Sequence, residues 1–174
     1  MGVDEEFARF ERAILPHLDA AYNLARWLTR SDHDAEDVVQ EACLRAFQFF
    51  GGFRGGDGRA WLLRVVRNTC YTWLERNRPR APAIAFDDDK HSAAGGAGPL
   101  NLTLQGEDVQ MLHQAIEGLT PEYREVIVLR ELEGFSYKDI AGIVESPLGT
   151  VMSRLARARE RLQHALAKHM SEEP

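Results

Sequence analysis

Residues 136–159 read SYKDIAGIVESPLGTVMSRLARAR, and this stretch decides the fold of the second half of the chain. Ser136, followed three residues later by Asp139, resembles a capping box and predicts the start of a short helix. Ser146 and Pro147 repeat the start signal, because a cap residue is followed by proline at the first helical position. A short helix, a tight turn and a longer basic helix together predict a helix-turn-helix.

The second helix of this motif has an apolar stripe on one side and DNA-binding residue types on the others. Expected to face inward at helical spacing are Val151, Leu155, Ala158, Leu162 and Leu166. The candidate DNA contacts are Thr150, Met152, Ser153, Arg154, Arg157 and Arg159. The first turns of a recognition helix read base edges in the major groove, where arginine to guanine is the commonest specific contact. The alternative is a helical hairpin whose arginines are merely solvated. One residue departs from the usual motif, because Glu145 stands near the turn position where glycine is common.

Helical periodicity continues upstream of this motif, and no segment has the alternation typical of a strand. A helix is expected at about 109–119, and Thr120 with Pro121 predicts another that closes at Gly134. In the first half, helices are expected at about 7–14 and 18–28 with a break near Pro16, then at 34–50 and 59–77.

Two of these helices carry specific expectations about their buried sides. In the helix at 34–50, Asp34 is expected to be the N-cap. Its buried residues are expected to be Val39, Cys43, Phe47 and Phe50. In the helix at 59–77 they are expected to be Leu62, Val66, Thr69 and Trp73. Trp61 fits the core and the surface equally well.

Between the two halves the periodicity disappears. Residues 79–108 are dominated by alanine, glycine, proline and aspartate, with three consecutive aspartates at 87–89. So long a stretch without helical pattern is uncommon inside a compact domain and is typical of a linker. The sequence therefore predicts an all-α protein with two small helical domains, 1–78 and 109–170, joined by a flexible acidic linker at 79–108.

Charge is distributed unevenly along the chain. The formal net charge is −6, which alone argues against nucleic-acid binding. Residues 59–80, however, hold six basic and one acidic side chain, and residues 146–170 hold five and one. Attraction to phosphate is local, because it falls off over about 10 Å at 0.1 M salt. The pattern predicts a protein that touches DNA at two places and binds it weakly on its own.

Several function classes find no support in the sequence. The two cysteines, Cys43 and Cys70, form no CxxC pair, so no disulfide framework is expected. The six histidines are scattered without HExxH spacing, and the glycine-rich segment at 51–58 follows no strand. The acidic start is no signal peptide, and no run of about 18 apolar residues exists. We therefore expect a cytoplasmic protein that is not an enzyme, with no cofactor, metal or membrane insertion.

Two helices of the first half show contrasting outer faces. The helix at 34–50 presents Asp37, Gln40, Glu41 and Leu44, which suit docking to a basic surface with an apolar centre; an ordinary solvated face is the alternative. The helix at 59–77 presents Arg64, Arg67, Asn68 and Tyr71. Arginines, rings and an amide supply backbone charge, stacking surface and base-edge donors, which are what unpaired bases need.

Four segments resemble the extracytoplasmic-function sigma factors of the sigma-70 family. Residues 34–42 (DAEDVVQEA) resemble region 2.2, and residues 60–69 (AWLLRVVRNT) resemble regions 2.3 and 2.4. Residues 119–137 are similar to region 4.1, and residues 149–159 (GTVMSRLARAR) are similar to region 4.2. No single segment is decisive, but the ordered set, around a linker where the family has one, is specific.

The resemblance implies an alternative sigma factor that binds core RNA polymerase and directs initiation at promoters, often in a stress response. Asp37, Gln40, Glu41 and Leu44 would engage the clamp helices of the β′ subunit, and the second domain would dock on the β flap. The minus-10 element would be met by Phe53, Arg54, Trp61, Arg64, Arg67, Asn68 and Tyr71. Among these, Asn68 would take part in capturing a flipped base. An anti-sigma factor would control the protein.

The minus-35 element would be met by the six candidate contacts of the last helix. Met152 stands where relatives often carry lysine or arginine, so the preferred sequence is expected to differ from theirs. Two other functions remain as alternatives. A conventional helix-turn-helix regulator would bind duplex DNA stably without polymerase. A sigma mimic would sequester an anti-sigma factor and would not need the DNA-facing arginines.

Overall fold

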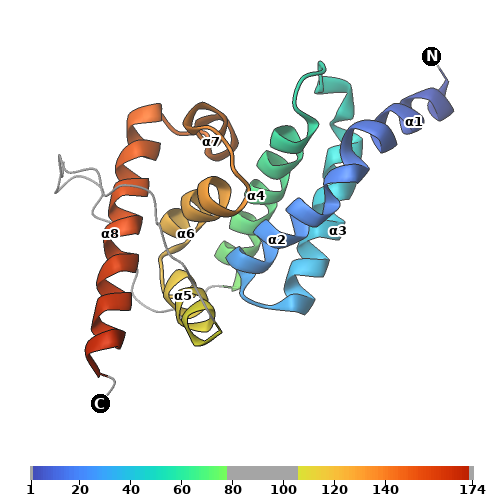
Figure 1. The fold of residues 1–174 in the computed structure, drawn as a ribbon. Coiled ribbons are helices and arrows are strands. Elements are labelled where there is room, and N and C mark those ends of the chain that lie inside the picture. Colours follow the sequence, from blue (N-terminus) through green and yellow to red (C-terminus); the bar gives the residue numbers. More distant parts are fainter. Residues whose placement is uncertain (1, 78–105, 173–174) are drawn as a thin grey trace. The chain divides into compact units, whose positions relative to one another are not determined.

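The computed structural model describes residues 2–77 and 106–172. Within these ranges the regular structure is helical and contains no strand, as the sequence predicts. Two compact units form (Figure 1): one contains α1 to α4, the other contains α5, α6 and α8, and the residues of α7 are divided between the two. The predicted linker lies outside the described residues except for 106–108, where α5 begins.

In the first unit, helix boundaries follow the proline and capping signals of the sequence. The elements are α1 (Val3–Ile14), the 3-10 helix η1 (Leu15–His17), α2 (Leu18–Thr29), α3 (Asp32–Gln48), the 3-10 helix η2 (Phe50–Gly52) and α4 (Gly58–Asn77). Pro16 lies in η1 and separates α1 from α2, as predicted. α2, α3 and α4 pack against one another, and α1 contacts α4.

α3 differs from the prediction in its cap and in its buried side. The N-cap is Ser31 rather than Asp34, and the Ser31 hydroxyl accepts a hydrogen bond from the Asp34 backbone N–H at 3.3 Å. Val39 and Cys43 are half-buried, and Phe47 is 40% exposed. Phe50, just after the helix, is buried as predicted, but within α3 the buried residues are Ala35, Val38, Ala42 and Ala46. The prediction followed the largest apolar side chains, whereas small residues let neighbouring helices approach closely.

α4 agrees better with its prediction. Leu62, Val66 and Thr69 are buried as predicted, together with Leu63 and Cys70. Trp73, which was also expected in the core, is only half-buried.

An aromatic cluster joins α1, η2 and the loop before α4. The Phe50 ring meets Phe10 edge-on at 5.3 Å and stacks on Phe53 at 5.4 Å. Trp61 lies 5.4 Å from Phe53 and extends the cluster into α4. Arg9 of α1 donates a hydrogen bond to the Phe53 carbonyl oxygen at 3.1 Å, and its guanidinium lies 5.3 Å from the centre of the Phe50 ring. α1 therefore anchors the loop that leads into α4.

The start of α4 also lies close to α1. Gly58 is buried, and a Cβ at this position would collide with the carbonyl oxygen of Ala13, so no larger residue fits without movement. The preceding Asp57 caps α4, because its carboxylate accepts hydrogen bonds from the backbone N–H groups of Arg59 at 3.0 Å and Ala60 at 3.2 Å.

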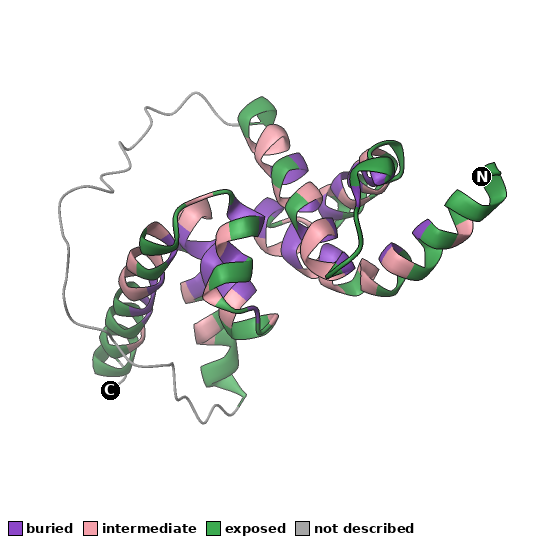
Figure 2. Cartoon of the chain, turned by 90° about the horizontal axis from the view of Figure 1, so that it is seen from above, coloured by how far each residue is buried: buried purple, intermediate pink, exposed green. Residues whose placement is uncertain are grey.

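The second unit is built around the last helix. Its elements, with the shared α7, are α5 (Glu107–Glu117), α6 (Pro121–Ile127), the π-helix η3 (Val128–Leu132), α7 (Tyr137–Val144) and α8 (Leu148–Glu172). α8 packs on α5 and α6. Its buried apolar residues are Val151, Leu155, Ala158 and Leu162, as predicted. Figure 2 colours the buried positions of each helix purple. Leu166, the last residue of the predicted stripe, is half-buried.

The predicted start and stop signals of this unit also hold. Thr120 is the N-cap of α6 with Pro121 at the first position, and Gly134 has a φ of +72° just after η3. The Ser136 hydroxyl accepts a hydrogen bond from the Asp139 N–H at 3.1 Å, so the capping-box residue acts as predicted.

A buried arginine fixes the end of α5. Arg124 is 3% exposed and donates hydrogen bonds to the carbonyl oxygens of Ile116 at 3.3 Å, Glu117 at 3.1 Å and Leu119 at 2.6 Å. The last carbonyl groups of a helix have no partner within the helix. One side chain of α6 therefore satisfies them and sets the connection between α5 and α6.

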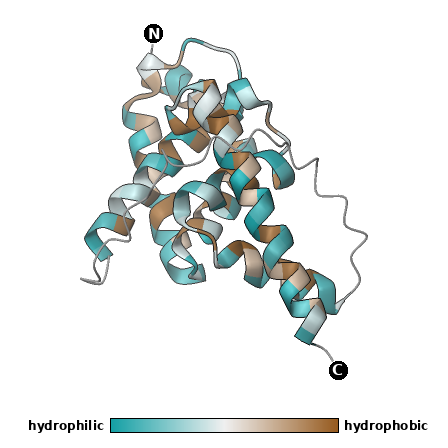
Figure 3. Ribbon diagram, turned by 90° about the vertical axis from the view of Figure 1, so that its left-hand side faces the viewer, coloured by the Kyte–Doolittle hydropathy of each residue, from teal (hydrophilic) through white to brown (hydrophobic). Residues whose placement is uncertain are grey.

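The helices are amphipathic rather than apolar throughout. Figure 3 shows hydrophilic and hydrophobic positions alternating along α8 and its neighbours. In the described ranges, no helix combines the length and the apolar character needed to cross a membrane.

Candidate nucleic-acid interface

The outer face of α4 brings together the side chains that the sequence predicts for unpaired DNA. Arg64 and Asn68 are exposed one turn apart, and Trp61, Arg67 and Tyr71 beside them are half-buried. The guanidinium carbon of Arg67 lies 3.8 Å from the centre of the Tyr71 ring, a cation–π contact. The Arg67 Nη1 also donates to the Asn68 Oδ1 at 3.4 Å. One helix face thus presents positive charge, aromatic surface and an amide.

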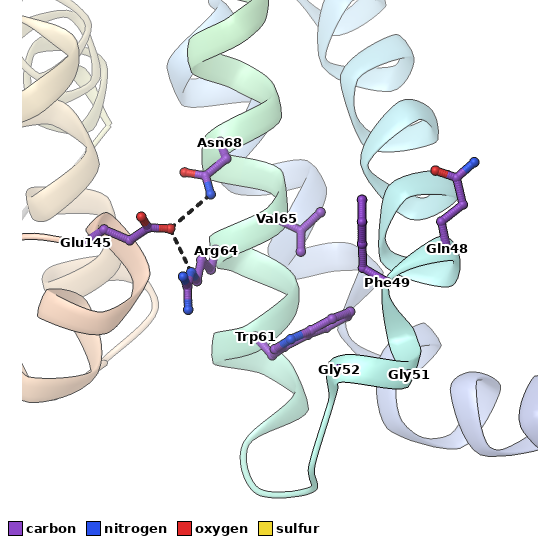
Figure 4. A pocket seen from close by; sticks show the side chains of 9 residues that line it. All are labelled: Gln48, Phe49, Gly51, Gly52, Trp61, Arg64, Val65, Asn68 and Glu145. Carbon is purple, nitrogen blue, oxygen red and sulfur yellow. Dashed lines mark hydrogen bonds and ion pairs between the residues drawn. The ribbon is translucent and has the colours of Figure 1, made fainter.

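A hollow borders this face of α4 at the end of α3 (Figure 4). The residues around it include Gln48, Phe49, Gly51 and Gly52 from the α3 end, and Trp61, Arg64, Val65 and Asn68 from α4. Gly51 and Gly52 have open space where a side chain would stand, so backbone borders the hollow there. Rings, an aliphatic side chain and polar groups are the combination needed to hold a flat heteroaromatic base.

Phe49 and Gln48 border the hollow but were not among the predicted site residues. Phe49 is 67% exposed, whereas the adjacent Phe50 is 1% exposed. A signal for this was present in the sequence. Consecutive residues at a helix end point about 100° apart, so only one ring of a Phe-Phe pair enters the core.

The predicted loop residues Phe53 and Arg54 lie in different environments. Phe53 is only 8% exposed, because its ring packs on Phe50 and Trp61. Its ring therefore supports the wall of the hollow from behind. Arg54 is exposed, and the next two residues, both glycines, have φ of +89° and +88° and turn the loop towards α4.

The predicted docking face of α3 is largely exposed. Asp37, Gln40 and Leu44 lie on the surface, with Leu44 63% exposed. Glu41 is half-buried, and its carboxylate accepts a hydrogen bond from the Arg45 guanidinium at 2.7 Å. Spacings of three and four residues place these side chains on one side of the helix. The face therefore combines acidic groups with an apolar centre.

Glu145, which stands where glycine is common, lies in the turn between α7 and α8. This residue has a φ of +52°, the left-handed conformation that glycine adopts most easily. α8 then begins after Pro147, whose carbonyl oxygen accepts the Val151 N–H at 3.1 Å. Helix, turn and helix follow in the predicted order.

The first turns of α8 present most of the predicted duplex contacts. Met152 is 51% exposed. Half-buried at the same end of the helix are Thr150, Ser153, Arg154 and Arg157. The Ser153 hydroxyl donates to the Thr150 carbonyl oxygen at 3.4 Å. An apolar side chain thus stands at the position with the greatest exposure among these five.

Arg159, also predicted as a DNA contact, differs from this group in its surroundings. It is 7% exposed, and its Nε and Nη2 donate to Glu131 Oε1 at 3.0 and 2.8 Å. Burial acts to lower the pKa of the Arg159 guanidinium, but hydrogen bonding and charge from Glu131 and Tyr137 outweigh it, so the pKa is raised. The side chain joins α8 to η3.

Potential metal ligands and two cysteines occur within the described part of the chain. Across 2–77 and 106–172, no three or more His, Cys, Asp or Glu side chains gather in a way that would hold a metal ion. Burial raises the pKa of the Cys43 thiol, and Cys70 is fully buried.

Comparisons with known proteins match the chain in two segments, which residues 81–108 separate. Residues 13–80 match the family described as "Sigma-70 region 2", and residues 109–162 match "Sigma-70, region 4". The chain is 39% identical over 139 residues to the ECF RNA polymerase sigma-E factor of Escherichia coli K12, covering 75% of this chain and 73% of that one. It is 34% identical over 164 residues to the ECF RNA polymerase sigma factor SigE of Mycolicibacterium smegmatis, covering 94% of this chain but 63% of that longer protein.

Solved structures of sigma factors are also similar to this chain. The sigma factor RpoE of Bartonella quintana, in complex with the anti-sigma factor NepR, is 31% identical with a TM-score of 0.68, covering 91% of this chain and 97% of that one. CnrH, in complex with the cytosolic domain of CnrY, is 24% identical with a TM-score of 0.63, covering 94% and 89%, and shares the fold. The relatives are sigma factors, which act in transcription and are not enzymes. By these matches in both halves, the chain belongs to the extracytoplasmic-function sigma factors of the sigma-70 family.

Proposed function

We propose that this chain binds core RNA polymerase in the cytoplasm and directs transcription initiation at specific promoters, with no catalytic activity of its own. Residues 1–78 act as region 2, residues 79–108 as the linker and residues 109–170 as region 4. One observation carries the proposal: a single chain holds an α4 face suited to unpaired bases and an α8 helix suited to duplex DNA. A promoter that is being opened contains both unpaired bases and duplex DNA.

The exposed side of α3 is the proposed polymerase contact. Asp37, Gln40 and Glu41 surround Leu44, so a partner with basic residues around a small apolar pocket would fit. The clamp helices of the β′ subunit are the expected partner by family membership, and the β flap is the expected partner of the second unit.

α4 and the hollow beside it are the proposed minus-10 site. Extruding a base from the stack costs a few kcal/mol, which new contacts must offset. Asn68 offers a donor and an acceptor to the edge of a base, while Arg64 and Arg67 supply charge for the backbone. Also in this site are Trp61, Tyr71 and Arg54, with Phe53 as support behind Trp61.

The first turns of α8 are the proposed minus-35 site. Arg154 and Arg157 can donate to guanine or phosphate, and Met152 can make only apolar contact, as with the methyl group of thymine. Thr150 and Ser153 complete the site. Arg159 is omitted, because Glu131 occupies its guanidinium.

Control by an anti-sigma factor is part of the proposal. It is supported by the Bartonella quintana relative, whose structure was solved with the anti-sigma factor NepR. The surfaces proposed to bind polymerase and promoter are those that an inhibitor would need to cover.

In vitro transcription tests this function. The purified chain is mixed with core RNA polymerase of its source bacterium and fragmented genomic DNA, and the 5′ ends of the transcripts are sequenced. We expect a limited set of defined start sites that share upstream elements and are absent without the chain. Failure to associate with core enzyme, or the absence of defined starts, would refute the proposal. Stable duplex binding without polymerase would favour a conventional regulator.

A further inference from the structure

We propose that Phe49 is a stacking platform for one unpaired base of the melted promoter strand, bound in the hollow beside α4. The inference rests on the proposed function, because it names a ring on which a base captured by region 2 would stack. The ligand is a nucleobase without a pairing partner.

The exposure of Phe49 is the first observation behind this assignment. Leaving a ring in water forgoes the gain from burial, yet Phe49 is 67% exposed. Its neighbours are engaged: Phe50 lies in the core, and Phe47 meets the rings of Phe7 at 6.0 Å and Phe10 at 5.3 Å. Within the described ranges no ring contact involves Phe49.

The backbone of Phe49 is held from both sides. Its N–H donates to the Arg45 carbonyl oxygen at 2.9 Å, and its own carbonyl oxygen accepts the Gly52 N–H at 2.9 Å. A ring on a fixed backbone has little further freedom to lose when a ligand binds. Binding a ligand therefore needs to fix only the two side-chain torsions of the ring.

The α4 side of the hollow adds apolar surface to that of Phe49. Figure 4 shows Val65 and the Trp61 ring on the side of α4 nearest Phe49, whereas the Asn68 and Arg64 side chains point away from Phe49. A base that lies against Phe49 therefore meets a second ring and an aliphatic side chain on the α4 side of the hollow. Stacking accepts any base, because every base has a π face.

The test uses holoenzyme assembled from the chain and core polymerase. The ligand is a single-stranded minus-10 oligonucleotide from a start site mapped with the wild-type chain, with 2-aminopurine placed at each position in turn. Stacking on an aromatic ring quenches this fluorophore. The variants are Phe49→Ala, Phe49→Leu, which keeps apolar bulk without a ring, and Phe49→Tyr, which keeps the ring. Phe7→Ala is the matched control, because Phe7 is 46% exposed on α1 and does not border the hollow.

We expect wild type and Phe49→Tyr to quench 2-aminopurine at one position and to bind within about twofold of each other. Phe49→Ala and Phe49→Leu should lose that quenching. Phe49→Ala should bind about 5- to 140-fold more weakly, from about 1–3 kcal/mol per stacked base and 1.4 kcal/mol per tenfold change. Phe7→Ala should behave as wild type.

Two results would overturn the assignment: Phe49→Ala binding and quenching like wild type, or Phe49→Leu quenching like wild type. Both leave the proposed function intact, since the wild-type holoenzyme still starts RNA. A wild-type chain that starts no RNA would instead refute the function and this inference together.

Discussion

Asn68 carries the amide at the centre of the proposed minus-10 site. It is exposed on α4, one turn from Arg64, and its carbonyl oxygen accepts a hydrogen bond from Arg67. An amide in this setting can pair with a base edge without affecting the core of the helix bundle. Binding of polymerase and opening of the promoter should therefore be separable at this residue.

Asn68→Ala should impair promoter opening and leave binding to core polymerase unchanged. Losing one or two hydrogen bonds to a base would cost about 1–3 kcal/mol in the open complex. Permanganate reactivity of minus-10 thymines measures opening, and native gels with core enzyme measure binding. Asn77→Ala, at the far end of α4, is the control. Normal opening by the Asn68 variant would remove this residue from the site.

Arg157 and Arg159 stand two residues apart on α8 and should respond oppositely to truncation. Arg157→Ala should cost about 1–3 kcal/mol in promoter binding and relax the preference at one minus-35 position, with little change in thermal stability. Arg159→Ala removes the partner of Glu131 and should lower the free energy of unfolding by about 1.5–3 kcal/mol. Selection from a randomised minus-35 library and thermal melts of both variants measure the two effects. Equal weakening across all sequences would make Arg157 a phosphate contact.

These two arginines also mark how far side-chain roles could be read from the sequence. Both occur in a basic run of a recognition helix, although helical spacing sets Arg159, four residues after Leu155, nearer to the apolar stripe than Arg157. Glu131, which occupies Arg159, lies 28 residues earlier in the chain. Such a pairing becomes visible only when the fold brings α8 to η3. The same applies to Phe53, whose burial depends on Phe50 and Trp61.

At the scale of elements, the boundaries of the helices could be predicted well and their orientation less so. Pro16, Pro121, Ser136 and Pro147 mark the starts and breaks through local backbone chemistry, which needs no tertiary information. The buried side of α3 depends on which neighbours it meets. Because those neighbours approach closely, alanines fill the interface and the larger Phe47 stays near the edge.

A pair of substitutions tests this orientation of α3. Ala42 is fully buried, so Ala42→Leu should overpack the core and destabilise the unit by about 1–3 kcal/mol. Leu44 is 63% exposed, so Leu44→Ala should change stability by less than about 0.5 kcal/mol. If α3 docks on polymerase, Leu44→Ala should weaken that complex by about 1 kcal/mol or more. Urea unfolding and titration with core enzyme provide the measurements. A strongly destabilised Leu44→Ala would show that the buried side has been misassigned.

On the scale of the whole molecule, each unit has its own small core and its own basic segment. Phe50, Leu62 and Val66 lie in one core, and Ile127, Leu129 and Leu155 lie in the other. The net charge of the chain is −6, so long-range attraction to DNA is weak. Two weak contacts become strong when a larger scaffold holds both at the spacing of their targets.

The free chain should therefore bind promoter duplex at least about 100-fold more weakly than the holoenzyme does at the same salt concentration. Fluorescence anisotropy with a labelled promoter fragment measures both affinities. A fragment with scrambled minus-10 and minus-35 elements is the control for non-specific binding. Equal affinities for the free chain and the holoenzyme would contradict the role assigned to polymerase.

The contact of α1 with the loop before α4 has a practical consequence for dissecting the protein. The match to region 2 begins at residue 13, whereas Arg9 and Phe10 lie before that point and hold Phe53 and Phe50 in place. A fragment trimmed to the family boundary would keep every residue proposed to touch DNA and yet lose the brace behind them. Anyone isolating this half for binding studies should retain the first helix.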